Sequence, residues 1–208
     1  MTEKEKMFAG KIYDPFCEGM PMERRKAHEL CQKYNRTPES DEAARKAILA
    51  ELMPDQGEGV YLQGPIQFDF GTHITMGKGS YANFNFVVLD ENHVTIGENV
   101  FIGPNCSILT PIHPLCHEHR KTFFNKETGT CTNIEYSAPV TIENNCWIGG
   151  NVTILPGVTI GEGSVIGAGS VVAKSIPPHS LALGSPCRVI RSITRQDRLS
   201  NHPELFAD

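Results

Sequence analysis

The chain has no surplus of positive charge, no long apolar run and no paired cysteine motif. Nineteen Lys and Arg against 24 Asp and Glu give a formal net charge of -5, and a negative field repels the phosphates of nucleic acid. No uncharged apolar stretch approaches the ~20 residues that a membrane-spanning helix needs, and the opening MTEKEKMFAGKIYD is too polar for a signal peptide. We expect a cytoplasmic protein whose partners include neither nucleic acid nor a membrane.

The cysteines also exclude a stabilising framework of disulfides or metals. They are seven in number, scattered, and never spaced as C-x-x-C, so we interpret them as reduced packing groups. A chain of 208 residues buries about 70% of its unfolded surface on folding without such cross-links. We expect one domain, or a domain with an appendage.

The first part of the chain, residues 1–58, shows a helical pattern. Pro21 suits the first turn of a helix from Met22 to Asn35, in which apolar residues recur at helical spacing. A second helix follows, with Thr37 or Ser40 as its N-cap and an apolar stripe of Ala44, Ile48, Leu49 and Leu52. The two predict a helical hairpin, which ends at the Pro- and Gly-containing stretch MPDQGEG.

Residues 59–176 carry an internal repeat with a period of six. Eight of the seventeen isoleucines fall in phase, and Val172 completes the series of Ile96, Ile102, Ile108, Ile142, Ile148, Ile154, Ile160 and Ile166. A weaker version runs upstream, with a two-residue slip before Ile96. Six is three strand periods and no multiple of the helical 3.6, so each hexapeptide predicts a short strand with one inward aliphatic side chain. Three such strands make one coil, and stacked coils make a parallel β-helix.

Two stretches depart from the repeat. Residues 114–136 are polar, charged and out of phase, and they predict a long loop inserted into the solenoid, of the kind that is usually functional. The tail, residues 177–208, begins with Pro177 and Pro178 and continues as RVIRSITRQDRLS. We interpret this tail as a capping helix at one end of the solenoid.

Four segments together closely resemble the hexapeptide-repeat sugar O-acetyltransferases, the maltose and galactoside acetyltransferase family. They are YDPFCEGMPMERRKA, YANFNFVVLD, IHP and NNCWIGGNVTILPGVTIGEGSVIGAGSVVAKSIPPHSLALGSPCRVIR. The resemblance implies a mainly β protein with a left-handed parallel β-helix, a handedness that the period alone does not predict. It also implies a homotrimer with acetyl-CoA and the active sites between subunits, a small-molecule sugar acceptor, and no metal.

The resemblance assigns the catalytic role to His113, which directly precedes Pro114 at the point where the repeat breaks. A neutral imidazole can take a proton from a sugar hydroxyl near neutral pH. Glu135, at the far end of the loop, is the candidate that orients His113, although a solvated loop charge is an equally good interpretation. The backbone N–H of Gly150 is the candidate donor to the oxyanion of the tetrahedral intermediate.

The resemblance also carries over five acceptor-binding positions: Asp14, Asp69, Tyr81, Asn83 and Glu91. Asn83 could instead be a corner amide with left-handed backbone, Tyr81 a packing aromatic, and Asp14 a cap of the helical hairpin. Asp69 and Glu91 differ from the side chains of the galactoside enzyme. The identity of the acceptor therefore stays open, and a lipo-oligosaccharide, a drug hydroxyl or an amine are alternatives.

For the CoA donor, the resemblance indicates seven positions: Trp147, Gly150, Ala168, Ala173, Lys174, Arg188 and Arg191. Gly150 and Ala168 offer only backbone groups, which suit the amides of the pantetheine arm. The three cations suit the phosphates and the adenine end.

A competing class is the γ-class carbonic anhydrases, which share the left-handed β-helix and hold zinc with three histidines across a subunit interface. His73, His93, His113, His117 and His119 supply enough imidazoles for such a site, but the CoA-type tail would then have no role. A scaffold without chemistry is a third class. It would be expected to lose His113 or the basic tail, and the chain has both.

Overall fold

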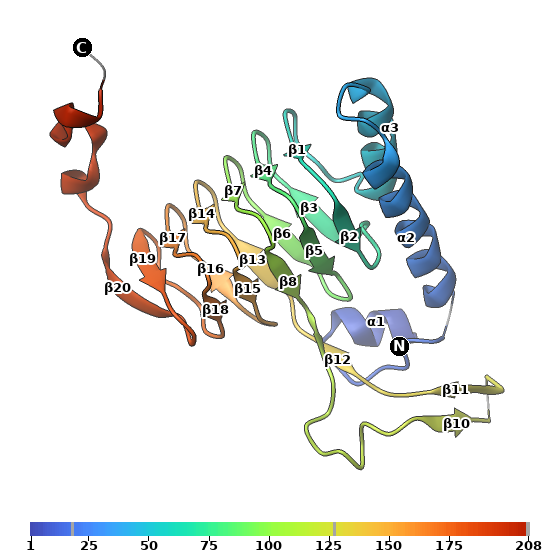
Figure 1. Cartoon of the computed structure of the whole chain (residues 1–208). Helices are drawn as coiled ribbons and strands as arrows, with labels where there is room; N and C mark the ends of the chain where they lie inside the picture. Colours follow the sequence, from blue (N-terminus) through green and yellow to red (C-terminus); the bar gives the residue numbers. More distant parts are fainter. Residues whose placement is uncertain (18, 127, 207–208) are drawn as a thin grey trace.

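The repeat folds into a solenoid of about six turns, which confirms the predicted β-helix (Figure 1). The computed structural model describes residues 1–17, 19–126 and 128–206. The solenoid has three faces of parallel strands, joined at three corners. The seven-stranded face contains, in spatial order, β1 (Tyr61–Leu62), β4 (Tyr81–Ala82), β7 (Phe101–Ile102), β14 (Trp147–Ile148), β17 (Val165–Ile166), β19 (Ser180–Leu183) and β20 (Arg188–Ser192), the last of them antiparallel.

The other two faces are shorter. The five-stranded face consists of β18 (Val171–Val172), β15 (Thr153–Ile154), β8 (Ser107–Leu109), β5 (Phe86–Leu89) and β2 (Ile66–Phe68). The four-stranded face consists of β16 (Thr159–Ile160), β13 (Val140–Ile142), β6 (Val94–Ile96) and β3 (Ile74–Met76).

The core is a column of repeat residues inside the triangle. Ile148 pairs in register with Ile102 on one side and Ile166 on the other, and each is at most 2% exposed. Alternation along a strand sends every second side chain inward, so two-residue strands such as β14 bury one residue and expose the other. Close packing of this column is the main stabilisation of the solenoid.

One corner of the solenoid is built by asparagines in left-handed backbone. Asn85, Asn105 and Asn151 have φ of 59°, 58° and 57°, a conformation that asparagine tolerates better than most residues. Their side chains form a ladder, because the amide of Asn85 donates to Asn105 at 2.8 Å and that of Asn105 donates to Asn151 at 3.1 Å. This ladder joins coils that are far apart in sequence.

The coils are of two lengths, which explains the slip in the repeat. In the regular coils, Trp147 pairs with Val165, eighteen positions on. In the early coils, Val87 pairs with Ser107, twenty positions on. The longer connections lie between the five-stranded and four-stranded faces, for example between β5 and β6. We call this edge of the solenoid the acidic corner, because Asp69, Asp90 and Glu91 lie on it.

The inserted loop also leaves the solenoid at this corner. Its base is a short antiparallel pair, β9 (Pro111–Ile112) with β12 (Tyr136–Ser137), and it carries a hairpin of β10 (Phe123–Asn125) and β11 (Thr130–Thr132). Figure 1 shows this hairpin projecting from the solenoid on the side where α1 (Glu3–Phe8) packs. The repeat resumes in register beyond the loop, since Val94 pairs with Val140.

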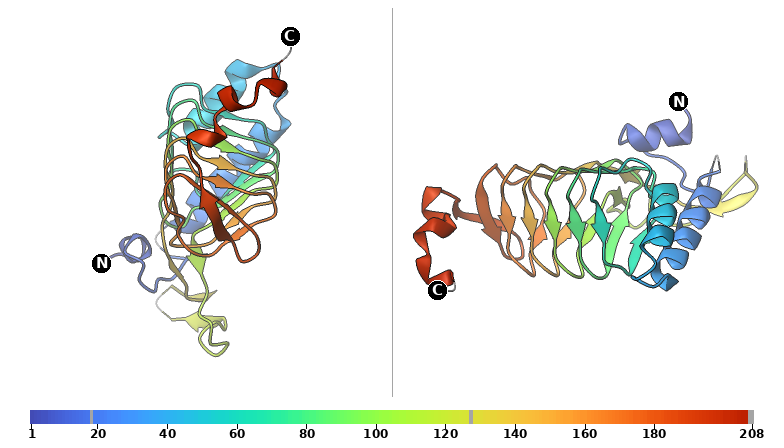
Figure 2. Two further views of the ribbon diagram at one scale, coloured as in Figure 1. Left: turned by 90° about the vertical axis from the view of Figure 1, so that its left-hand side faces the viewer. Right: turned by 90° about the horizontal axis from the view of Figure 1, so that it is seen from above.

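Two further helices cover the first coil (Figure 2). Helix α2 runs over Met20–Arg36 with Pro21 in its first turn, as predicted, and α3 runs over Glu42–Leu52. The expected N-cap of α3, Thr37 or Ser40, was wrong: Asp41 accepts from the N–H of Ala44, because Pro38 to Asp41 form a turn before the helix, closed by the N–H of Asp41 to the carbonyl of Pro38. Met22 is 74% exposed and does not join the buried stripe. Helix α1 was not predicted.

The tail differs from the predicted capping helix. Residues Arg188–Ser192 form β20, which pairs with β19, and three short 3-10 turns follow: Arg195–Asp197, Leu199–Asn201 and Pro203–Leu205. The free edge of β19 offers unpaired backbone groups, and the β-branched Val189 and Ile190 favour extended backbone over helix. Across the part of the chain that the structure describes, no helix has the length and apolarity to cross a membrane.

Candidate active site

His113 and Glu135 face each other across the base of the inserted loop. His113 directly follows β9 and Glu135 directly precedes β12, and Ile112 pairs with Tyr136. This antiparallel register brings Nδ1 of His113 within 3.6 Å of Oε2 of Glu135, beyond an ordinary hydrogen bond but close enough for electrostatic attraction. The side chain of His113 is 51% exposed and that of Glu135 only 8%. A solvent-accessible imidazole therefore lies against a buried carboxylate.

Tyr13 fixes Glu135 from the other side, and the sequence analysis missed it. Its hydroxyl donates to Oε1 of Glu135 at 2.7 Å, and the backbones of the two residues pair at 2.9 and 3.2 Å. Burial and the charge of Glu135 raise the pKa of Tyr13 far above its ordinary value, so the tyrosine is a neutral donor. Tyr13 lies beside Asp14 in the N-terminal motif, but nothing in the sequence joins it to residue 135.

Asp14 is buried, and it ties the N-terminal segment to the hairpin of the loop. Its carboxylate accepts from the hydroxyl of Thr132, from the amide of Asn125 at 3.1 Å and from the N–H of Phe16 at 2.9 Å. Burial alone would raise the pKa of Asp14, but these hydrogen bonds outweigh it and hold the pKa below its ordinary value. Most of the hydrogen-bonding capacity of Asp14 is therefore used inside the chain.

Three carboxyl groups gather at the acidic corner, next to Glu135. Glu91 is 7% exposed, and its carboxyl group lies close enough to that of Asp69 for the two to interact. Burial, followed by the interaction with Asp69 and the charge of Glu135, raises the pKa of Glu91 far above its ordinary value. Asp90 is fully buried, and burial raises its pKa to about 6. Asp69 and Glu91 thus lie at the same corner as the base of the inserted loop, and Glu91 lies within the electrostatic influence of Glu135.

Tyr81 and Asn83 lie elsewhere on the coil. Tyr81 is in β4 on the seven-stranded face, where it stacks on Tyr61 with ring centroids 6.1 Å apart. Asn83 follows that strand, at the corner next to the five-stranded face, and its side chain accepts from the N–H of Phe84 at 2.7 Å. Its φ is not positive, and Asn85 takes the left-handed corner position instead. A single chain therefore places three of the five acceptor candidates, Asp14, Asp69 and Glu91, on the side of the solenoid where Glu135 lies, and the other two, Tyr81 and Asn83, at another corner.

Gly150 and Ala168 lie at the same corner in successive coils, between the seven-stranded and five-stranded faces. The carbonyl of Gly150 accepts from the N–H of Gly169 at 2.9 Å, whereas the N–H of Gly150 takes part in no hydrogen bond among the residues that the structure describes. A Cβ on Gly103 would meet this nitrogen at 2.6 Å, so the adjacent coil packs closely behind it. The corner offers an unused backbone donor.

The remaining donor-side candidates are exposed. Trp147, on the seven-stranded face, is 56% exposed, and Ala173 and Lys174 are exposed just after β18. Arg188 and Arg191 lie on β20. The guanidinium of Arg191 forms a bidentate pair with Asp197 at 2.6 and 2.9 Å, a contact that the sequence analysis did not anticipate.

Two histidines of the zinc alternative, His73 and His93, make other contacts within the chain. His73 is buried and donates through Nδ1 to the carbonyl of Asp90 at 2.6 Å, and the ring of Phe8 stacks on His93 with centroids 4.4 Å apart. Within residues 1–17, 19–126 and 128–206, no three His, Cys, Asp or Glu side chains gather as a metal site would require.

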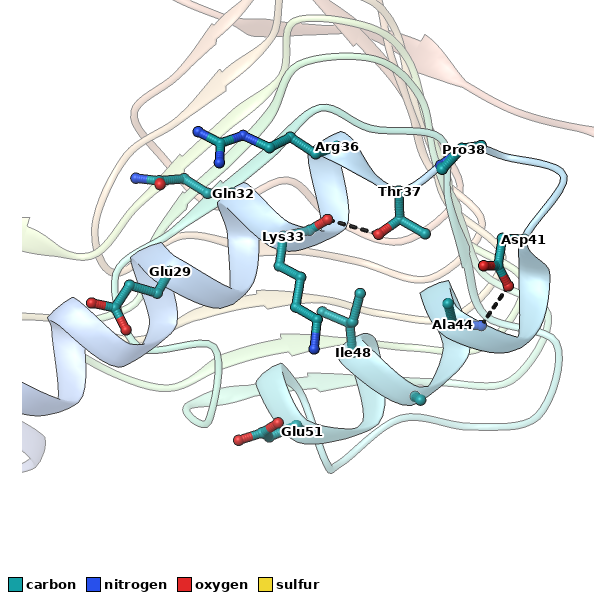
Figure 3. Close-up of a pocket in the computed structure, with 11 residues that line it drawn as sticks. Glu29, Gln32, Lys33, Arg36, Thr37, Pro38, Asp41, Ala44, Ile48 and Glu51 are labelled. Carbon is teal, nitrogen blue, oxygen red and sulfur yellow. Dashed lines mark hydrogen bonds between the residues drawn. The ribbon is translucent and has the colours of Figure 1, made fainter.

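A separate groove lies between α2 and α3 (Figure 3). Its lining includes Glu29, Lys33, Arg36 and Glu51, and none of the residues expected to bind acceptor or CoA. In the close-up, Thr37 and Asp41 make capping hydrogen bonds with Lys33 and Ala44, so these polar groups serve the hairpin itself.

Comparisons with known proteins agree along almost the whole chain. Residues 6–57 match a family described as the maltose acetyltransferase hexapeptide capping motif. Residues 139–174 match the bacterial transferase hexapeptide of six repeats, and residues 93–113 match a hexapeptide repeat of succinyl-transferase. These segments cover the helical cap and both sides of the inserted loop.

Three full-length relatives show the same similarity. The galactoside O-acetyltransferase of Escherichia coli K12 is 43% identical over 95% of this chain and 93% of its own. A solved galactoside acetyltransferase in complex with coenzyme A superposes with a TM-score of 0.87 at 42% identity, covering 95% and 94% of the two chains. A hexapeptide-repeat acetyltransferase from Vibrio cholerae with acetyl-CoA bound gives 0.81 at 36% identity, covering 93% and 100%.

Proposed function

This chain belongs to the maltose and galactoside acetyltransferase family of hexapeptide-repeat proteins, and from that premise we propose that it acetylates a sugar hydroxyl directly, with His113 as the general base. It is an acyltransferase that uses acetyl-CoA. The acetyl group passes to the acceptor in a ternary complex, without an acyl-enzyme.

The chain of contacts from Tyr13 through Glu135 to His113 carries this proposal. Tyr13 and the backbone pairing fix the Glu135 carboxylate. Glu135 faces Nδ1 of His113, so a proton on Nδ1 leaves Nε2 free to accept the proton of an attacking hydroxyl. The 3.6 Å separation is of the kind that shortens when positive charge develops on the imidazole. Glu135 would then stabilise the imidazolium.

The donor side fits the same reaction. The unused N–H of Gly150 is the donor that we assign to the oxygen of the tetrahedral intermediate, because a backbone donor needs no reorganisation. Trp147, Ala168, Ala173 and Lys174 would line the path of the CoA arm. Arg188 and Arg191 would bind its phosphates.

The assembly that this function requires is a trimer. Tyr81 and Asn83 occupy a different corner from His113, so a complete acceptor site needs these two residues from a neighbouring subunit. Three such sites close around a threefold axis. Light scattering should return three times the mass of the 22.9 kDa chain, and a monomer that keeps full activity would contradict this arrangement.

Replacement of His113 by Ala tests the mechanism. General base catalysis typically contributes 10² to 10⁴ in rate, about 3 to 5.5 kcal/mol. We expect kcat to fall by that factor in His113→Ala with little change in KM for acetyl-CoA. Thiol release in a sugar acceptor screen is the measurement. His119→Ala, an exposed histidine of the same loop, is the matched control, and a loss within about threefold in His113→Ala would reject the assignment.

A further inference from the structure

Asp69 and Glu91 are brought together by the two long coils. Asp69 follows β2 and Glu91 lies two positions beyond the end of β5, and these strands pair in parallel. Oδ1 of Asp90 accepts from the N–H of Asp69 at 3.1 Å and from that of Phe70 at 2.9 Å. The backbone at Asp69 is therefore fixed against the next coil, with its side chain next to Glu91.

The two carboxyl groups differ in exposure. Glu91 is 7% exposed, and its Oε2 is buried without a hydrogen-bond donor among the described residues. The side chain of Asp69 is 18% exposed, and its Oδ1 lies 3.2 Å from Nε2 of His28 on α2. Asp69 is thus the member of the pair that has both a partial opening to solvent and an imidazole nitrogen within hydrogen-bond reach.

Two ionised carboxylates in contact at a buried position are unstable, and such pairs hold one proton between them. The proton resides on the member that is less able to be hydrated or paired. We propose that Asp69 and Glu91 share a single proton carried by Glu91, and that the Glu91 O–H and His28 together position an ionised Asp69 to receive a hydroxyl of the acceptor.

This inference rests on the proposed function for its acceptor and gives the two residues separate roles. Asp69 is the group that contacts the acceptor, while Glu91 and His28 are positioning residues. The charges that act most strongly on Glu91 favour a retained proton, because they are the carboxylates of Asp69 and Glu135. The titratable groups around this corner are Asp69, Asp90, Glu135, Tyr13, His28, His73 and Arg24.

The shared proton can be observed without any turnover. A protonated carboxyl has an infrared C=O stretch distinct from that of a carboxylate, and we expect the wild-type protein to show one at pH 8. This pH lies above the titration of Asp90, whose pKa is about 6. Glu91→Gln should abolish the band, whereas Glu135→Gln, the matched control at the other buried glutamate, should keep it. No band, or a band that survives Glu91→Gln, would overturn the proposal.

Acceptor kinetics test the positioning role. The amide of a glutamine at position 91 can donate to Asp69 as the acid O–H does, whereas alanine cannot. We expect KM for the sugar acceptor to be about tenfold or more higher in Glu91→Ala than in Glu91→Gln, with KM for acetyl-CoA alike in both. Equal values for the two variants would show that Glu91 does not position Asp69.

Replacement of Asp69 completes the test. Asp69→Asn removes the charge that keeps Glu91 protonated, so the infrared band should disappear at a lower pH than in the wild type. The band of the wild-type protein and its acetyl transfer are independent readouts. Transfer without the band overturns the shared proton, and the band without transfer overturns the acceptor role and the proposed function while the shared proton stands.

Discussion

The regular coils from residue 139 to 174 and the long coils from residue 66 to 110 belong to one solenoid but contain different chemistry. Coils of eighteen residues bury only aliphatic side chains, cysteine and serine. Coils of twenty bury His73, Asp90, Glu91 and Asn92 as well. The two extra residues per coil are the source of the difference, because they lie in the connections where these polar groups occur.

The difference teaches that the repeat supplies stability and that its irregularities supply the buried polar groups around the candidate acceptor site, whereas the donor-side candidates Gly150 and Ala168 lie at corners of the regular coils. A buried charge costs several kcal/mol unless it is paired or neutralised, and an eighteen-residue coil has no loop to house its partners. The longer connections provide backbone donors, such as the N–H groups that bind Asp90.

Truncation of a core residue in the regular coils should have the largest effect, and this effect should be on stability alone. Ile160→Ala removes a fully buried side chain in β16, and such truncations cost about 2 to 5 kcal/mol. Thr159→Ala, next to it on the outward side of the strand, should cost at most about 0.5 kcal/mol. Urea unfolding of both variants measures the difference. A large loss of kcat in the folded Ile160→Ala protein would contradict the view that the core of the regular coils contributes to stability alone.

In the long coils, stability should depend on pH through His73. Burial, the largest cause, lowers its pKa from 6.5 to about 4. Between pH 6.5 and 4 the unfolded chain binds this proton more tightly than the folded one, so stability present above pH 6.5 is lost as the pH falls through that window. The loss amounts to about 3 kcal/mol.

His73→Gln isolates this contribution, because glutamine cannot titrate. Asp90 and Glu91 have raised pKa values and act with the opposite sign, so the wild-type profile alone is not diagnostic. The difference in unfolding free energy between wild type and variant, measured at pH 4.5 and 7.5, should change by most of the 3 kcal/mol. A difference independent of pH would show that His73 is hydrated or charged in the folded protein.

The affinity for acetyl-CoA should depend on the positive charges of the tail, whereas the stability of the fold should not. Arg188 and Arg191 lie on β20, whose residues are all exposed. Replacing both with Ala should weaken acetyl-CoA binding about tenfold or more and leave the midpoint of urea unfolding unaltered. Titration calorimetry with CoA is the measurement, and Arg195→Ala, an exposed arginine of the following turn, is the control. Unchanged CoA affinity in the double variant would show that Arg188 and Arg191 do not bind CoA.

The smallest effect concerns Asp197. It holds both nitrogens of the Arg191 fork, and this hydrogen bonding lowers the pKa of Asp197 to about 2. A phosphate must replace it to bind Arg191 in the same way. We therefore expect Asp197→Asn to improve CoA affinity by no more than a few-fold, since exposed ion pairs contribute little. Weaker CoA binding in this variant would mean that Asp197 positions Arg191 for the phosphate.

The solenoid could be predicted because the hydrophobic pattern that produces it is periodic. The spacing of six residues alone is enough to predict that an in-phase isoleucine lies inside the triangle. The site depends on contacts at long range, such as the 122 positions that separate Tyr13 from Glu135, and no local pattern contains these. His113 became a candidate through a resemblance, but the contacts of Tyr13 with Glu135, of Thr132 with Asp14 and of His28 with Asp69 follow only from the folded backbone. The tail was misjudged because its strand forms on the edge of β19, which the tail sequence does not indicate.

The clamp of β9 and β12 at the base of the inserted loop bears on how such a protein can diversify. The chain leaves the solenoid and returns to it at neighbouring points, and the solenoid continues in register beyond the loop. The length of the loop therefore has little effect on the packing of the core. Doubling the length of a flexible loop costs only about 0.6 kcal/mol in closure entropy. Variation in the part of the loop that makes no contact with the buried Asp14 is therefore nearly neutral for folding, while the pairing of β9 with β12 keeps His113 and Glu135 fixed at the two ends of the loop. The loop can change in length and composition while the geometry of this candidate catalytic pair is kept.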